Sequence, residues 1–244
     1  MKTIGIVGGL AWPSSIVYYR VINELIAQRS GDGGLHSAKL VMAQTDFAEV
    51  ERNQRLGRWD VVGQLLAEQA TRLKAAGADF FLVACNTVHA AAEHFENAVD
   101  LPFLHVVDPT ARRILDGGFH TVGLLGSRYT MIGGYFVDRL RERYGLEVLV
   151  AEGEHRDHVH NALYDELAKG IFRPETRKRF KAAIADLVDR GAEVVVLGCT
   201  EFGMLVEAQD SPVPLVDTAL VHAEAAVDLA LSTPETRATA GGRS

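Results

Sequence analysis

The fold is decided by a stretch that occurs twice, first as Gly77-Ala78-Asp79-Phe80-Phe81-Leu82-Val83-Ala84-Cys85-Asn86-Thr87 and later as Gly191-Ala192-Glu193-Val194-Val195-Val196-Leu197-Gly198-Cys199-Thr200-Glu201. In both copies a glycine precedes a short apolar run, and a cysteine follows at the same spacing. The chain contains only these 2 cysteines. Continuous apolar runs of this length are too short for typical helices, so they predict parallel strands covered on both faces.

Two other landmarks recur in the same order. The run Thr3-Ile4-Gly5-Ile6-Val7-Gly8-Gly9 returns as Thr121-Val122-Gly123-Leu124-Leu125-Gly126-Ser127, and Leu101-Pro102-Phe103 returns as Val213-Pro214-Leu215. Three landmarks with nearly constant spacing indicate that one structural unit occurs twice.

Helical periodicity precedes each copy of the cysteine stretch. Residues 60–76 carry apolar side chains at helical spacing before Gly77, and the segment from Pro174 does the same before Gly191. Alternating strands and helices imply parallel sheets with right-handed crossovers. The sequence therefore predicts an α/β protein of two pseudo-symmetric lobes, each a parallel-sheet α/β sandwich, with the active site in the cleft between them.

The repeat also suggests lobe boundaries. We expect residues 1–105 plus 213–231 to form the first α/β lobe and residues 106–212 to form the second. Residues 232–244 are small and polar without periodicity, so we expect a flexible tail.

Composition limits the classes of partner. The 244 residues carry a formal net charge of −7, which disfavours binding to nucleic acid or to an anionic membrane surface. The longest apolar runs fall well short of the roughly 20 residues that span a bilayer, and the N-terminus lacks a signal-peptide pattern. We therefore expect a cytoplasmic protein that acts on a small molecule.

Position makes the two cysteines candidate catalysts. Ligands of open parallel sheets bind outside the carboxyl ends of the strands, where Cys85 and Cys199 are predicted to lie. A helix beginning near Val88 would lower the pKa of the Cys85 thiol. Its free N–H groups, with Asn86, Thr87 and Thr200, suit a carboxylate. Two thiols on opposite sides of one molecule would suit inversion of a carbon stereocentre, which needs a base on one face and an acid on the other.

Simpler interpretations compete with several of these assignments. A single free cysteine is more often a small buried hydrophobe than a catalyst, although equivalent positions in a repeat argue for function. The glycines of Gly5–Gly9 lack the full pattern of a nucleotide-binding loop. The cluster His155, His158 and His160 is read as solvated surface rather than a metal site, and His89 either faces the thiol or packs in the core.

At these residues the chain resembles the cofactor-independent aspartate/glutamate racemase superfamily, through Ala84-Cys85-Asn86-Thr87, Gly198-Cys199-Thr200-Glu201 and the opening Gly8-Gly9. The resemblance covers nearly the whole chain and implies Cys85 and Cys199 as the catalytic acid/base pair, without pyridoxal phosphate, metal or nucleotide. It also implies a homodimer. By position, Asn86, Thr87 and Thr200 would bind the α-carboxylate or amino group, while Gly9, Ser127 and Thr130 would line the cleft.

Within that family, Gly8-Gly9 and Glu201 depart from glutamate racemases, which have Asp-Ser and a histidine at these places. The chain is more similar to the branch of aspartate and broad-specificity amino-acid racemases. Such enzymes hold a distal carboxylate with an arginine and a lysine, and Arg52 and Lys169 occupy those neighbourhoods. The resemblance therefore favours an acidic amino-acid substrate modestly, with Arg52, Lys169 and Glu201 among the substrate-binding residues.

Other functions of the same fold stay open at this stage. Relatives isomerise maleate, racemise hydantoins or decarboxylate malonates, and a non-catalytic amino-acid sensor or redox-sensing thiol protein would also fit. The sequence leaves the preferred amino acid, its enantiomer and the physiological role undetermined.

Overall fold

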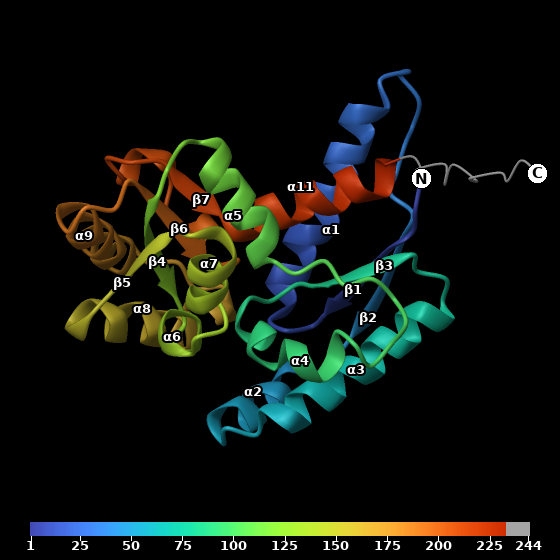
Figure 1. Ribbon diagram of the computed structural model, residues 1–244, viewed down its shortest axis with the longest axis horizontal. Coiled ribbons are helices and arrows are strands. Elements are labelled where there is room, and N and C mark those ends of the chain that lie inside the picture. Colours follow the sequence, from blue (N-terminus) through green and yellow to red (C-terminus); the bar gives the residue numbers. More distant parts are fainter. Residues whose placement is uncertain (233–244) are drawn as a thin grey trace, which may run out of the picture.

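The computed structural model describes residues 1–232 as two α/β halves joined side by side (Figure 1). The first half contains a parallel sheet of three strands in the order β2-β1-β3, and the second a parallel sheet of four in the order β5-β4-β6-β7. The expected α/β class with two parallel sheets is confirmed. The expected tail, apart from Ser232, lies outside the described residues.

The elements of the first half follow one another in a regular alternation. They are β1 (Ile4–Gly8), α1 (Trp12–Ser30), β2 (Leu40–Gln44), α2 (Phe47–Arg55), α3 (Trp59–Ala75), β3 (Phe80–Val83), the 3₁₀ helix η1 (Thr87–Ala91) and α4 (Ala92–Phe95).

The second half repeats this alternation with additional short helices. Its elements are α5 (Val107–Asp116), β4 (Thr121–Gly126), α6 (Arg128–Ile132), α7 (Val137–Tyr144), β5 (Glu147–Val150), α8 (Gly153–Asp165), η2 (Leu167–Lys169), α9 (Pro174–Asp189), β6 (Val194–Gly198), α10 (Phe202–Leu205), η3 (Ala208–Asp210), β7 (Leu215–Asp217) and α11 (Thr218–Leu231).

The sequence repeat has a direct structural counterpart. β1 and β4 are the strands that open the two copies, and each pairs with the strand that ends before a cysteine, β3 or β6. The proline landmarks also correspond, because the Phe81 N–H donates to the Pro102 carbonyl at 2.9 Å and the Val195 N–H donates to the Pro214 carbonyl at 3.0 Å. The two copies therefore bring their cysteines to equivalent strand ends.

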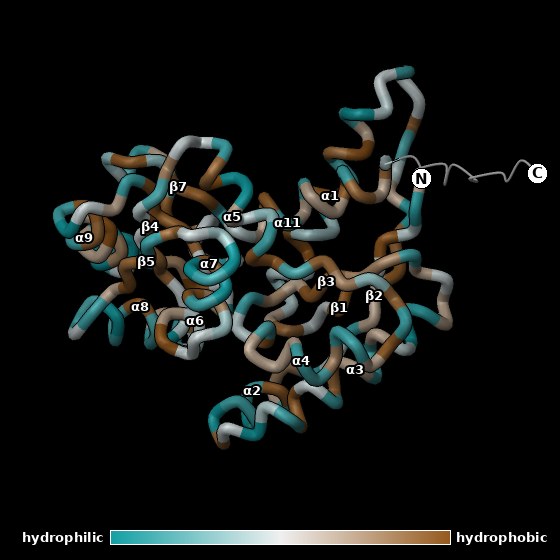
Figure 2. Tube along the Cα trace, in the orientation of Figure 1, coloured by the Kyte–Doolittle hydropathy of each residue, from teal (hydrophilic) through white to brown (hydrophobic). Residues whose placement is uncertain are grey.

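Apolar packing covers both faces of both sheets. In the first half, α3 and α4 cover one face, and α1 and α11 cover the other. In the second half, α8 and α9 cover one face, and α5 and α7 the other. β3 and β6 are buried along their whole length, as their apolar runs predict. Figure 2 shows hydrophobic colour along the strands inside each half and hydrophilic colour on outer parts of α2 and α9.

The C-terminal segment divides between the two halves. β7 pairs with β6, so it completes the second sheet, whereas the sequence grouping of residues 213–231 assigned it to the first lobe. β7 joins the second sheet because it begins directly after Pro214, whose carbonyl already accepts a hydrogen bond from Val195 of β6. α11 then crosses back and packs on α1 through small side chains such as Ala223 and Ala226. None of the helices in the described part has the length and apolarity needed to span a bilayer.

Candidate active site

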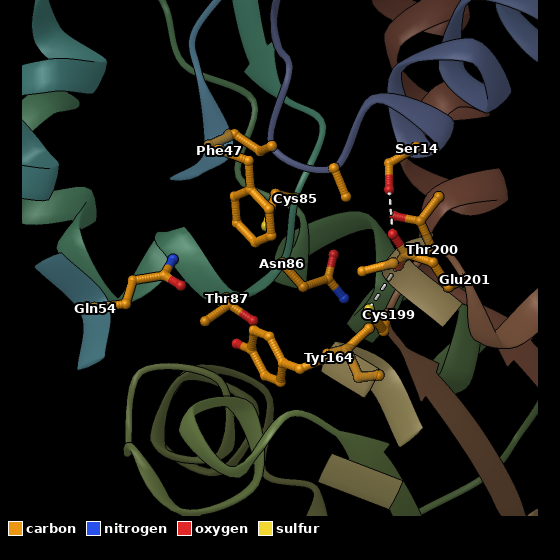
Figure 3. A pocket seen from close by; sticks show the side chains of 14 residues that line it. Ser14, Phe47, Gln54, Cys85, Asn86, Thr87, Tyr164, Cys199, Thr200 and Glu201 are labelled. Atoms are coloured by element: carbon orange, nitrogen blue, oxygen red, sulfur yellow. Dashed lines mark hydrogen bonds between the residues drawn. The ribbon is translucent and has the colours of Figure 1, made fainter. Parts of the chain in front are cut away.

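The two cysteines line one cavity between the halves (Figure 3). Cys85 follows β3 and Cys199 follows β6, so each thiol is carried by the carboxyl end of a buried parallel strand. The free space between the lining side chains, counted together with solvent at the open mouth, is about 370 Å³, and the space open to the centre of a water-sized sphere is about 20 Å³. The lining residues are Leu10, Ala11, Ser14, Phe47, Gln54, Cys85, Asn86, Thr87, Leu163, Tyr164, Ala168, Cys199, Thr200 and Glu201.

The protonation of the two thiols differs from the sequence expectation. Burial raises the pKa of the Cys85 thiol to about 12, although the backbone N–H groups of Val88 and Thr87 act in the opposite direction. Burial also raises the pKa of Cys199 well above its usual range, and the negative charge of Glu201 adds to this effect. The helix N-terminus behind Cys85 is one 3₁₀ segment, and its N–H groups do not offset the desolvation of a thiolate. Both cysteines are therefore thiols in the unliganded cavity.

Glu201 connects Cys199 to the first half of the protein. The Cys199 Sγ donates to Glu201 Oε2 at 2.9 Å, and the Ser14 hydroxyl donates to Glu201 Oε1 at 2.9 Å. Glu201 is only 2% exposed and has no ion-pair partner within residues 1–232. The cavity thus contains a buried carboxylate that faces the reacting region without a counter-cation.

A chain of hydroxyl groups fixes the orientation of Thr87. The Tyr135 hydroxyl donates to the Asn86 carbonyl at 2.8 Å, so it must accept from Thr130, at 2.9 Å. Thr130 consequently accepts from Ser127 at 3.1 Å, and Ser127 accepts from Thr87 at 2.9 Å. Each hydroxyl has one proton to donate, so the direction of the whole chain follows from its last member. The Thr87 hydroxyl is left with only lone pairs for the cavity.

Asn86 is held between the two halves by its side chain. Its Nδ2 donates to Thr218 Oγ1 at 2.8 Å, and Thr218 in turn donates to the Leu197 carbonyl at 2.8 Å. An amide NH₂ carries two protons, so one N–H of Asn86 is available beyond this bond. Figure 3 shows the Asn86 carboxamide directed toward the side of the cavity occupied by Cys199 and Thr200.

The histidines near the site support the backbone. His89 Nδ1 lies 2.9 Å from the carbonyl oxygen of Cys85, so the ring donates to that carbonyl and does not face the thiol. His222 Nε2 donates to the Leu104 carbonyl at 2.9 Å, which leaves Nδ1 to accept from the Tyr18 hydroxyl at 2.9 Å. Burial lowers the pKa of His89 to about 3 and that of His222 to about 4. Both rings are neutral structural groups: His89 fixes the segment around Cys85, and His222 links Tyr18 to the Leu104 carbonyl.

The remaining candidate residues lie outside the cavity lining. Arg52 and Lys169 are exposed, so the structure brings neither cation to the cavity. Gly9 forms part of the turn that follows β1. Its φ is +78°, and its backbone N–H donates to the Ser15 hydroxyl oxygen at 2.9 Å. Ser127 and Thr130 are fully buried behind Thr87 and act on the cavity only through the hydroxyl chain.

None of the three histidines of the histidine-rich segment lines the cavity that holds the cysteines. His155, His158 and His160 belong to α8, where His160 accepts from the Arg128 N–H at 3.1 Å. Within the described part of the chain, no group of three or more His, Cys, Asp or Glu side chains has the arrangement of a metal site.

Eight of the 14 lining residues are not among the site candidates from the sequence, and the polar or aromatic ones are Ser14, Phe47, Gln54 and Tyr164. Ser14 lies in the first turn of α1, Phe47 and Gln54 belong to α2, and Tyr164 belongs to α8. None lies within the repeated landmarks, and their residue types are common on ordinary helices. Only the packing of α2 and α8 around the strand ends reveals them.

Comparison with known proteins identifies the family. Residues 7–226 match the model of the Asp/Glu/hydantoin racemase family, and the chain belongs to that family. The chain is 24% identical over 176 residues to the broad-specificity amino-acid racemase RacX of Bacillus subtilis, covering 71% of this chain and 74% of RacX.

Two solved structures extend the similarity to the fold. A Yersinia pestis protein provisionally described as an Asp/Glu racemase is 42% identical, with a TM-score of 0.88 over 95% of this chain and 100% of that one. An aspartate racemase homologue from Pyrococcus horikoshii is 29% identical, with a TM-score of 0.80 over the same shares. The family match and the two structural similarities thus extend over nearly the whole chain.

Proposed function

We propose that this protein is an amino-acid racemase that inverts the α-carbon without a cofactor, using Cys85 and Cys199 as the two acid/base groups. The observation that carries the proposal is that both thiols line one cavity from equivalent strand ends. They are also near enough that a negative charge on Cys85 raises the pKa of Cys199. Family membership and the similarity to RacX support an amino acid as the substrate.

The cavity suits the two ends of an amino acid. The Thr87 hydroxyl presents lone pairs and Glu201 presents an unpaired negative charge, which together match an ammonium group. The second N–H of Asn86 and the hydroxyl of Thr200 are donors that match a carboxylate. We therefore assign the α-ammonium to Thr87 and Glu201, and the α-carboxylate to Asn86 and Thr200.

Substrate charge would also activate a thiol. Both cysteines are protonated in the empty cavity because burial opposes the thiolate. A bound ammonium places positive charge beside them and lowers the pKa of both. Since Glu201 accepts a hydrogen bond from Cys199, which thereby retains its proton, Cys85 ionises first and releases its proton to solvent as the substrate binds.

The proton balance of one turnover is then closed. With Cys85 as thiolate and Cys199 as thiol, Cys85 removes the α-proton from one face and the electron pair moves into the carboxylate. Cys199 delivers its proton to the opposite face, which leaves Cys85 as thiol and Cys199 as thiolate. The reverse reaction exchanges these roles, as a symmetric pair of like residues permits.

Incubation of a single enantiomer in deuterium oxide tests this mechanism. The protein should produce the mirror image with deuterium at the α position, and Cys85→Ser and Cys199→Ser should each abolish inversion. Mirror-image product that retains its α-protium would contradict the proposal, as would inversion that survives loss of either thiol.

A further inference from the structure

The cavity has a further polar side chain, on the side away from Thr200 and Glu201. Gln54 projects from α2 and is only 2% exposed. Neither its Nε2 nor its Oε1 has a hydrogen-bond partner among residues 1–232. Figure 3 places Gln54 across the cavity from Thr200 and Glu201, with its carboxamide turned inward. A buried amide without partners destabilises the free protein, which indicates a bond made only when a ligand is present.

Gln54 lines the cavity together with uncharged side chains, among them Phe47, Leu163, Tyr164 and Ala168. The 14 lining residues include no arginine, lysine or histidine, and Glu201 is their only charged member. A substrate carboxylate at this end would therefore be desolvated without a counter-cation, in a cavity that already contains a carboxylate.

An adjoining surface hollow, also bordered by Gln54 and Tyr164, contains one arginine, Arg55. Its other lining residues are Glu51, Tyr129, His160, Asn161 and Asp165. Arg55 pairs with Glu51 at 3.0 Å on the same helix. Because two acidic residues, Glu51 and Asp165, line the hollow together with this one arginine, its charge does not favour an acidic side chain.

The hydrogen-bonding groups of Gln54 indicate which kind of substrate side chain would suit this part of the cavity. Its unpartnered amide offers both a donor and an acceptor. An ammonium or guanidinium group satisfies only the oxygen, a carboxylate only the nitrogen, and a hydrocarbon neither. An uncharged carboxamide satisfies both, through two reciprocal hydrogen bonds.

We propose that Gln54 is the specificity-determining residue for the substrate side chain, and that the substrate is an amino acid with an uncharged side chain that both donates and accepts hydrogen bonds, a carboxamide above all. This inference rests on the proposed racemase function and goes beyond it, because the resemblance alone favours an acidic substrate. L-Glutamine, L-glutamate and L-methionine form a near-isosteric panel that differs in charge and hydrogen bonding.

The test compares α-deuterium exchange of these three amino acids by NMR in deuterium oxide. We expect kcat/KM for glutamine to exceed that for glutamate and for methionine, each on the order of 100-fold, because the buried amide of Gln54 is satisfied only by glutamine. In Gln54→Leu, glutamine should lose most of this advantage, while methionine should be processed as well as before or better. Gln64→Leu, at an exposed position of α3, is the matched control and should leave all three rates unchanged.

The unfolding temperature of Gln54→Leu provides a second measurement. It should change in opposite directions depending on whether Gln54 serves ligand binding or supports the fold. Without ligand, Gln54→Leu should unfold at a higher temperature than the parent protein, since it removes two unsatisfied buried groups. A glutamine whose amide supported the fold would instead give a lower unfolding temperature.

The outcomes separate the inference from the function on which it rests. Preference for glutamate, lysine or methionine, or a glutamine rate that is insensitive to Gln54→Leu, would overturn the specificity assignment while the racemase proposal stands. Exchange with no amino acid, including the aliphatic, acidic and basic ones, would overturn both.

Discussion

The thiol of Cys199 donates a hydrogen bond to Glu201 Oε2 at 2.9 Å, while the other oxygen of the same carboxylate accepts from Ser14 in the opposite half of the protein. Glu201 therefore affects the two cysteines differently. It accepts a hydrogen bond from Cys199, whereas it acts on Cys85 only through its negative charge. The two cysteines follow equivalent strand ends but have different electrostatic surroundings.

Replacement of Glu201 should make Cys199 easier to ionise. In a Cys85→Ser background, Glu201→Gln removes a negative charge and a hydrogen-bond acceptor that together help to raise the pKa of Cys199. The thiolate absorbance near 240 nm, corrected with the double variant Cys85→Ser/Cys199→Ser, should then emerge at lower pH as the pH is raised. Glu68→Gln, at an exposed position of α3, serves as the control and should leave the titration unchanged. An unaltered titration in Glu201→Gln would show that burial alone sets the pKa.

The hydroxyl chain behind Thr87 should contribute measurably to stability. Tyr135→Phe removes the bond to the Asn86 carbonyl and the acceptor for Thr130, and both lost bonds are partly buried. We expect a loss of about 1–3 kcal/mol in the free energy of unfolding, measured with urea. Tyr19→Phe changes an exposed tyrosine of α1 and should have almost no effect. Equal stability of the two variants would mean that the chain contributes nothing.

The repeat made the broad architecture predictable. Two copies of one strand and cysteine pattern correctly indicate two parallel sheets, and parallel strands bring the residues after each strand to the same carboxyl edge. Those statements depend on local patterns and general rules of topology. They do not require knowledge of which helices pack on the strand ends.

The details of the cavity required three-dimensional packing. Arg52 and Gln54 are two positions apart on α2, which corresponds to a rotation of about 200° around a helix. One is consequently exposed while the other lines the cavity. Ala168 and Lys169 are neighbours in η2, and they too differ in orientation: Ala168 lines the cavity and Lys169 is exposed. The direction of the Cys85 pKa also depends on burial, which reverses the effect expected from a helix N-terminus considered alone.

Gly9 should tolerate no side chain, for reasons of backbone geometry. Its φ is +78°, and a Cβ there would lie 2.1 Å from the Thr45 carbonyl oxygen. Gly9→Ala should reduce the free energy of unfolding by more than about 2 kcal/mol, because strain and overlap add. Gly57→Ala has a similar φ of +68° with nothing within 4 Å, so it isolates the cost of the backbone conformation. Similar losses in both variants would argue that the contact with Thr45 relaxes freely.

The buried histidines should make the fold sensitive to acid. Burial lowers the pKa of His89 to about 3 and of His222 to about 4, and it also lowers the pKa of His105. The unfolded chain binds these protons near pH 6.5, so the stability from each neutral ring is complete above that pH. It falls by about 1.4 kcal/mol per pH unit as the pH decreases toward the folded pKa.

One carboxyl group opposes this trend over part of the range. Burial raises the pKa of Asp217 to about 6, so its contribution to stability increases as the pH decreases from about 6 to its unfolded value near 3.8. Three histidines outweigh one aspartate, and the free energy of unfolding should therefore decrease between pH 6.5 and pH 4. His222→Gln, which can still bond Tyr18 and the Leu104 carbonyl, should make this decrease shallower by up to about 1.4 kcal/mol per pH unit. His158→Gln replaces a half-buried histidine of α8 that has no ion-pair partner among residues 1–232, and it should leave the slope nearly unchanged. Equal slopes in the two variants would therefore mean that His222 is protonated in the folded protein.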